Sequence, residues 1–554
     1  MQMGIGLETR ARGADRLARQ PLEQRANTPI TKATYAHSPL RVATWSSPVV
    51  HFSLGREYSS WMVIRASTAG RSKLAIGPVL QSAHSARVLL ILVCAGPLAA
   101  CAHFQPKALS AATTIAGFES RSLEAPGLRA FLAANHVAPP ARGTAWNLKA
   151  LTLTALYYQP ALAEARERLL AAQAARITAG ERPNPSFAIR PGHDAVVPGA
   201  LSPWIVPLSF DWPIETAGRR GYRLAEARHL AAAARWDLVG TVWRVRSRVR
   251  AALLGLYAAG RFESLLAREE STRQTVVRLL EGQFRAGNVS SYEVTQARIA
   301  LDRATLARQA AAGRMRQSRI ALAGALGVPL RALDGARFSF AALKAFPLAL
   351  TRAQVRQRAL LERADVRAAL ERYAASQSAL QLQIARQWPD IDLGPGFTWN
   401  AQLAGDRQWE LGLSLPLPIL NQNQGPIAEA KAQRSLAAAH FLTVETVAVT
   451  QIDSSLAAYD AARTQLITAD SLLHNLEHQT NSVNAQVAAG ELQPLDLANA
   501  RSAYEAGVEN RLDALVRAQQ SLGRLEDAVQ SPLTLAPVTV QAAERALDLR
   551  ATTP

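Results

Sequence analysis

Residues 409–430 read WELGLSLPLPILNQNQGPIAEA. The first half alternates large apolar residues with small or polar ones, which predicts a β-strand with one apolar face. The apolar set is Trp409, Leu411, Leu413 and Leu415. A Pro-rich segment follows, and an Ala-containing stretch then predicts the start of a helix. The chain is therefore expected to pass here from a strand directly into a helix.

A second alternating segment precedes this one, at residues 391–400. Its apolar side carries Ile391, Leu393, Phe397 and Trp399. Segments of about ten residues with one apolar, aromatic-tipped face suit the wall of a membrane barrel. The edge of a soluble β-sandwich is the alternative interpretation of these segments taken alone.

The same order of features occurs about 200 residues earlier, and this internal repeat is the most informative property of the chain. LSFDWPI at 208–214 matches LSLPLPI at 413–419. Residues 155–187 match 359–391 at an offset of 204, and residues 285–298 match 488–501. The sequence therefore predicts two tandem copies of one unit.

Each copy predicts the same elements in the same order. An Ala-rich helix of about 30 residues, two strands, a helix of about 65 to 70 residues, a Gly-marked turn and a returning helix of about 40 residues follow one another. Small or apolar residues at three- and four-residue spacing predict close helix packing, as in a coiled coil. They are Leu224, Ala227, Ala231, Ala234 and Leu238. The fold class is mainly α, and no unbroken apolar run is long enough to predict a membrane-spanning helix.

Residues 1–100 predict a leader that is removed. Basic residues precede the apolar run 88–93, and Leu98-Ala99-Ala100-Cys101 resembles the cleavage site of bacterial lipoproteins, in which the cysteine sulfur carries diacylglycerol. Ala102, rather than Asp, then favours the outer membrane. A plain signal peptide with an incidental cysteine is the alternative. Residues 1–61 fit no export signal, so Met62 is the expected start. Removal of the leader discards Cys94 and leaves Cys101 as the one cysteine, which excludes a disulfide.

Four strands per chain cannot close a barrel with a lumen. Lipid offers no hydrogen-bonding partner to open sheet edges, so several chains must contribute to one barrel. Three chains would give twelve strands, which lies within the range of bacterial barrels. The strand count therefore predicts an assembly of several identical chains.

With these residues in view, the chain resembles the TolC family of outer-membrane efflux channels, in its lipoprotein, cation-efflux (CzcC-like) branch. The most specific stretches are 387–397 and 411–430. The resemblance implies a trimeric twelve-strand barrel, a twelve-helix periplasmic tunnel and no enzymatic activity or cofactor beyond the lipid on Cys101. It also implies docking on a periplasmic adaptor that is linked to an inner-membrane RND-type pump.

The expected parts of the chain follow from the repeat and the resemblance. They are a leader at 1–100, a lipidated segment at 101–145, a first repeat at 146–328, a connector at 329–352, a second repeat at 353–532 and a tail at 533–554.

The hairpin tips are the expected functional end. Gly287 and Gly490 suit left-handed turns, and Pro494 suits the first turn of the returning helix. These positions would dock the adaptor. The resemblance implies that Asp496, with Glu491 and Glu293, contributes to a carboxylate ring at the entrance, although Asn499 stands where relatives carry a second acid. Helix acids placed to suit the dipole are the alternative.

Other functions are less well supported. A zinc-protease motif occurs at residues 474–478, which read His474-Asn475-Leu476-Glu477-His478. It lies within a long predicted helix and no third ligand stands out, so we expect no metal site. A metal-handling role during transit is the weaker alternative. Residues 101–554 carry a net charge of +11 as scattered Arg residues, which does not predict nucleic-acid binding. A periplasmic adaptor and a poreless coiled-coil lipoprotein are the rival classes. The resemblance to the cation-efflux branch favours heavy-metal cations as the cargo, with small organic compounds as the alternative.

Overall fold

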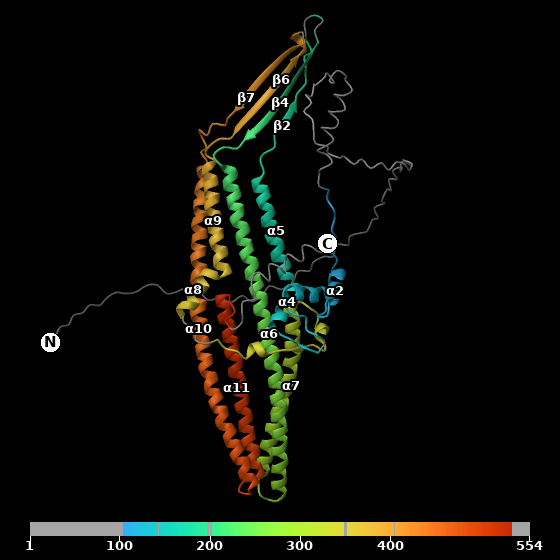
Figure 1. The fold of residues 1–554 in the computed structure, drawn as a ribbon, viewed down its shortest axis with the longest axis vertical. Coiled ribbons are helices and arrows are strands. Elements are labelled where there is room, and N and C mark those ends of the chain that lie inside the picture. Colours follow the sequence, from blue (N-terminus) through green and yellow to red (C-terminus); the bar gives the residue numbers. More distant parts are fainter. Residues whose placement is uncertain are drawn as a thin grey trace, which may run out of the picture. The chain divides into compact units, whose positions relative to one another are not determined.

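The computed structural model describes residues 103–141, 143–196, 199, 202–347, 352–403 and 405–533. Cys101 and the predicted leader lie outside this part of the chain. Within the unit Pro106–Pro554, helices dominate and most of the strands gather in one sheet (Figure 1). The expectation of a mainly α fold with two tandem repeats is confirmed.

Both copies have the same α-helices and strands in the same order, except that the first contains an additional short strand, Gly192–His193. The first comprises α4 (Leu148–Tyr158), α5 (Pro160–Gly180), β2 (Ser186–Ile189), β3 (Gly192–His193), β4 (Trp204–Ile214), α6 (Arg219–Arg285) and α7 (Ser291–Leu326). The second comprises α8 (Arg352–Glu362), α9 (Ala364–Ala385), β6 (Ile391–Asn400), β7 (Asp406–Ser414), α10 (Gln424–Ala488) and α11 (Pro494–Val529). The long helices have 67 and 65 residues and the returning helices 36 each, close to the predicted lengths.

The remaining elements flank the copies. They are α2 (Ala111–Glu119), α3 (Pro126–Ala134), β1 (Ala145–Trp146), the 3-10 helices η2 (Leu330–Leu333), η3 (Ala341–Leu343) and η4 (Ala401–Leu403), and β5 (Arg337–Phe338). β1 pairs in parallel with β5, so the segment between the copies is tied back to the start of the first copy. The largest hydrophobic core lies where α3, α4, α6, α7 and this segment meet, around the fully buried Leu151, Leu253 and Leu322.

The prediction of one opening helix of about 30 residues per copy is wrong, because each is broken once. The breaks fall at Gln159 and Arg363, both with extended backbone. The Gln159 amide donates to the carbonyls of Gly324 and Ala325, and the Arg363 guanidinium donates to the carbonyl of Ala528. Each break therefore satisfies the free carbonyls at the end of the returning helix of its own copy.

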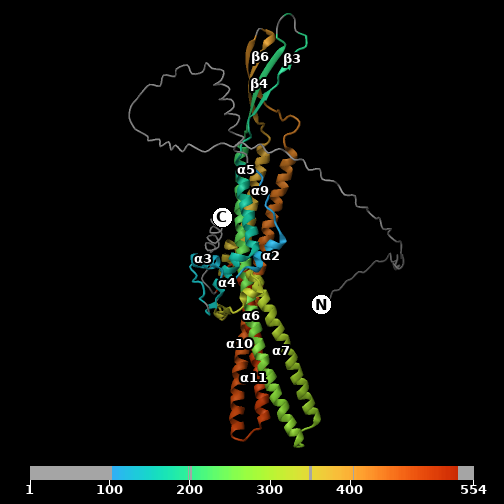
Figure 2. The ribbon, with the colours of Figure 1, turned by 90° about the vertical axis from the view of Figure 1, so that its right-hand side faces the viewer.

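The sheet has the strand order β2-β4-β6-β7, all antiparallel (Figure 1), and β3 extends the pairing along β4 (Figure 2). The register places Leu208 opposite Phe397 and Phe397 opposite Trp409. Residues directly opposite one another share a face. One face therefore collects most of the large apolar side chains of all four strands, among them Phe187, Ile189, Val206, Leu208, Phe210, Trp212, Leu393, Phe397, Trp399, Trp409, Leu411 and Leu413, with Arg407 opposite Trp399.

The opposite face of the sheet carries mainly polar residues and glycines, together with Ile205, Pro207 and Pro213 of β4. Ser209, Thr398, Gln408, Glu410 and Ser414 lie there with Gly394, Gly396 and Gly412. No described helix packs over either face, and Trp409 is 82% exposed. The outer edges of β2 and β7 pair with no described strand. This sheet is therefore incomplete as a single chain.

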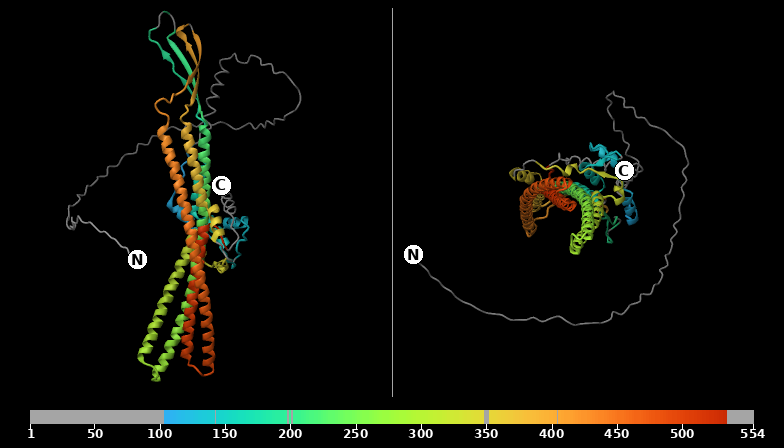
Figure 3. Two further views of the ribbon diagram at one scale, coloured as in Figure 1. Left: turned by 90° about the vertical axis from the view of Figure 1, so that its left-hand side faces the viewer. Right: turned by 90° about the horizontal axis from the view of Figure 1, so that it is seen from below.

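Below the sheet, α6 pairs with α7 and α10 with α11, and α6 also packs along α11 (Figure 3). A buried ion pair joins the two copies at this contact. Glu526 of α11, 1% exposed, lies 3.3 Å from a guanidinium nitrogen of Arg246 and 3.4 Å from one of Arg250 on α6. The neighbouring Asp527 accepts hydrogen bonds from Trp243 (2.9 Å) and Ser247 (2.6 Å). The two hairpins are thus bound to each other by polar contacts as well as by apolar packing.

By length and composition α10 is apolar enough to cross a membrane, although polar and charged residues interrupt it and it contains no long unbroken apolar run. Its qualifying window contains few charges and is mostly exposed, at 11% buried. Leu436, Leu442 and Val447 lie exposed on this helix. One such helix is weak evidence for a span, and the same surface suits contact with another protein chain.

Candidate functional site: the hairpin tips and the strand-to-helix junction

The two hairpin tips have the same backbone construction. Gly287 and Gly490 follow the ends of α6 and α10 with φ of 76° and 81°. In each tip the glycine N–H donates to the carbonyl three residues back, and the next residue, Asn288 or Glu491, donates to the carbonyl five residues back at 2.9 Å. This pattern closes a helix through a left-handed residue. A Cβ at either glycine would meet no atom within 4 Å, so the conformation alone demands glycine.

The returning helices also begin alike. Ser290 precedes α7, and Glu293 accepts from the backbone N–H of Ser290 at 2.7 Å. Gln493 precedes α11, and Asp496 accepts from the backbone N–H of Gln493 at 2.9 Å. Glu293 and Asp496 therefore each complete a capping box at the start of a returning helix. This is the helix-terminal role that the sequence offered as the alternative to a carboxylate ring. Pro494 occupies the first turn of α11.

The tips lie side by side. The side-chain amide of Gln283 on α6 donates to the amide oxygen of Gln493 at 2.9 Å, across 210 residues of sequence. Glu293, Glu491 and Asp496 are all exposed at this end of the unit. The predicted tip residues are thus brought together, and each carboxylate keeps a free face toward solvent.

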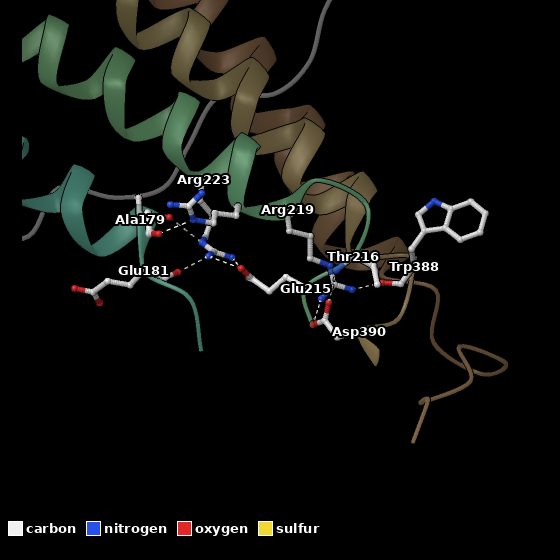
Figure 4. Close-up of polar contacts among 10 residues, drawn as sticks. Ala179, Glu181, Glu215, Thr216, Arg219, Arg223, Trp388 and Asp390 are labelled. Atoms are coloured by element: carbon white, nitrogen blue, oxygen red, sulfur yellow. Dashed lines mark hydrogen bonds and ion pairs between the residues drawn. The ribbon is translucent and has the colours of Figure 1, made fainter. Parts of the chain in front are cut away.

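A second polar cluster holds the junction of sheet and helices (Figure 4). Arg223 of α6 forms an ion pair with Glu215, which follows β4, and also donates to the carbonyls of Ala179 and Glu181. The hydrogen bond from Arg223 lowers the pKa of Glu215 below its usual range, against the opposing effect of partial burial. α5, β4 and α6 are thus tied at one point.

The same cluster reaches the second copy. Arg219, at the start of α6, pairs with Asp390 and donates to the carbonyl of Trp388. The hydroxyl of Thr216 donates to the carbonyl of Pro389 at 2.6 Å. Asp390 lies in the stretch that carried the family resemblance, but its partners are more than 170 residues away, so the sequence did not reveal this role.

In the described residues no group of three or more His, Cys, Asp or Glu side chains is arranged to hold a metal ion. The tips and the junction instead contain backbone turns, caps and exposed carboxylates. Such an arrangement can attract ions and contact another protein.

Comparison with known proteins agrees with this geometry. The family model described as "Outer membrane efflux protein" matches residues 152–328 and 355–529, once per copy. The cobalt-zinc-cadmium resistance protein CzcC of Cupriavidus metallidurans is 24% identical over 301 residues, covering 53% of this chain and 70% of CzcC.

Two solved structures have the same fold. The CmeC outer membrane channel of Campylobacter jejuni superposes with a TM-score of 0.57 at 17% identity, covering 72% of this chain and 89% of CmeC. The outer membrane protein VceC of Vibrio cholerae gives a TM-score of 0.57 at 18% identity, covering 69% of this chain and 95% of VceC.

Proposed function

Because the chain belongs to the outer membrane efflux protein family, which comprises channels rather than enzymes, we propose that it is the exit channel of a three-part export machine. The observation that carries this proposal is the open four-stranded sheet, apolar on one face and polar on the other, at one end of long paired helices. A soluble protein would cover the apolar face, and none of the described helices does so.

We propose that three chains complete the barrel. Each chain contributes β2, β4, β6 and β7, and the free edges of β2 and β7 pair between neighbours to close a twelve-stranded cylinder. The apolar face then contacts lipid, and the paired helices below it form a twelve-helix tunnel in the periplasm. The exposed apolar surface of α10 is available for contact between subunits.

The hairpin tips form the entrance in this arrangement. Three copies of Asp496, Glu491 and Glu293 would surround the opening and attract cations. Their capping roles occupy part of the Glu293 and Asp496 carboxylates and leave the rest exposed. The tip turns at Gly287, Gly490 and Pro494 would meet a periplasmic adaptor, itself bound to an RND-type pump.

We further propose that the chain is anchored in the outer membrane of a Gram-negative bacterium by a lipid on Cys101. The cysteine lies outside the described residues, so the support is the sequence around it. Heavy-metal cations are the proposed cargo, supported by the similarity to a cobalt-zinc-cadmium resistance protein. Small organic compounds remain the alternative cargo, because an exit duct selects little by itself.

Purification from outer-membrane fractions tests the channel. We expect a trimer that dissociates to monomers only on heating and that conducts single-channel currents in a planar bilayer. A protein that stays monomeric and soluble after removal of the acyl group would contradict the proposal. If the chain were instead a periplasmic adaptor, it would associate with the pump but would conduct no current in the bilayer. The conductance measurement therefore distinguishes the channel from this main rival.

The entrance acids have a separate test in the same bilayers. The double variant E293Q/D496N should lower the preference for cations over anions, because it removes six negative charges from a trimer while keeping hydrogen-bond acceptors at the caps. E164Q, on the exposed surface of α5, is the matched control and should leave selectivity unchanged. Unaltered selectivity in E293Q/D496N would show that these acids serve only as caps.

A further inference from the structure

Two histidines on α10 point at each other. The Nε2 atoms of His474 and His478 lie 3.1 Å apart, and the two rings meet edge to face with centroids 4.4 Å apart. Both side chains are exposed. The motif therefore presents two imidazole nitrogens at one point of the surface rather than a pair of unrelated helix residues.

This separation matches two ligands of a single metal ion. Zinc–nitrogen bonds are about 2.0–2.1 Å long, so two nitrogens on one ion are about 2.9 Å apart at a right angle and about 3.4 Å apart at the tetrahedral angle. The observed 3.1 Å lies between these values. With the ring protons on Nδ1, both Nε2 lone pairs are free to bind.

The pair lies away from the packed face of the helix. Leu473 and Leu476 sit against Gly507 of α11, and Thr480 donates to the carbonyl of Ala500. A helix turns about 100° per residue, which places His474 and His478 roughly 100–160° around from these three contact residues. Metal binding therefore requires no rearrangement of the α10–α11 packing.

We propose that His474 and His478 form a binding site for one borderline divalent cation, of the class of Zn²⁺, Co²⁺, Ni²⁺ or Cu²⁺, which imidazole ligands favour. Glu477 lies between them in sequence and adds negative charge, but it does not complete a three-residue group. With two protein ligands, water fills the remaining positions. The site is therefore open, and its ion exchanges readily.

The position suits brief contact with ions near the periplasmic end. His478 lies twelve residues before Gly490, or about 18 Å along the helix from the tip. The idea that the bound ion is exported cargo rests on the proposed function. Binding of the ion to the two histidines does not depend on that function, so it is measured separately from trimer formation and conductance.

Electron paramagnetic resonance of Cu²⁺ tests the site on the full chain, purified in detergent without an affinity tag. At less than one equivalent of Cu²⁺, we expect nitrogen couplings from two imidazoles. H474A or H478A should leave one imidazole and weaken binding by roughly tenfold to a hundredfold, because the second ligand no longer acts within the same molecule. H440A, which removes a solitary exposed histidine of the same helix, should change neither property.

A relocated pair provides the decisive control. In H474A/S482H the two imidazoles again lie four residues apart, at 478 and 482, on an exposed part of α10. This variant should regain the two-imidazole spectrum and the affinity. A wild-type spectrum and affinity equal to those of H474A/H478A would overturn the proposal, as would failure of the relocated pair to bind while helicity is unchanged.

Discussion

Gly287 and Gly490 meet the same backbone requirement at two points 203 residues apart. Each has positive φ and open space around it, so a side chain would be opposed by backbone conformation rather than by a neighbour. The sequence suggested these turns from the repeat, because Gly followed each long helical pattern. It did not show that the tips touch, since the Gln283–Gln493 contact depends on how the hairpins pack.

Replacing Gly490 by alanine should destabilise the tip by about 1 kcal/mol, because a left-handed conformation is unfavourable for a residue with a Cβ. Hydrogen exchange of the amides at the tip measures the change. Gly282, inside α6 and also free of neighbours, is the matched control: G282A should leave the tip unchanged or stabilise the helix. Equal effects of G282A and G490A would contradict this explanation.

Glu526 should contribute more to stability than any exposed acid. Its carboxylate is buried between Arg246 and Arg250, so E526A leaves two buried guanidinium groups without their counter-ion. Loss of one partner from a buried ion pair costs about 3–5 kcal/mol. Urea unfolding followed by circular dichroism should show the loss. E164A, which breaks the exposed pair with Arg168, should have little effect.

The ion pair of Glu215 and Arg223 predicts an acid-dependent loss of stability at the junction. The folded-state pKa of Glu215 is lowered, so its contribution is full above the unfolded pKa of about 4.3 and disappears as the pH falls through the folded value. Thermal unfolding between pH 6 and about pH 3 should therefore show a steeper loss for the wild type than for E215Q. Parallel curves would indicate that Arg223 does not stabilise the carboxylate.

At the scale of the elements, periodicity predicted most of the structure. The long and returning helices have nearly the predicted lengths, because their apolar spacing is continuous and free of internal Pro. The breaks at Gln159 and Arg363 were missed for a physical reason. In the first copy the residue after the break is Pro160, which begins α5. In the second copy the break rests on hydrogen bonds of Arg363 to Ala528 and Gln451, which lie far away in sequence.

The two faces of the sheet should respond oppositely to a positive charge. Leu411 is 76% exposed on the apolar face, and Gln408 lies on the polar face opposite Thr398. In the proposed barrel, L411R would place Arg in lipid at a cost of about 2–4 kcal/mol near the membrane centre. Recovery of folded trimer from outer membranes should fall for L411R. Q408R should be recovered normally, and equal recovery would argue against a lipid-facing surface.

For the whole unit, alternation in the sequence predicted which face of each strand is apolar, and the register brings these faces together across four strands. The sequence did not predict how the two copies are joined. Arg246 and Glu526 are 280 residues apart, and single charged residues in long helices give no indication of their partners. Contacts between copies therefore had to come from the structure.

The glycines of the polar face have a consequence for permeation. Gly394 and Gly412 bring their backbones together, so a Cβ on Gly412 would lie 3.2 Å from the carbonyl oxygen of Gly394. In the proposed barrel this part of the inner wall offers peptide groups and few side chains to a passing solute. The stretch around Gly394 and Gly412 therefore adds neither charge nor bulk, so any choice of what leaves the cell has to be made elsewhere along the path of the solute.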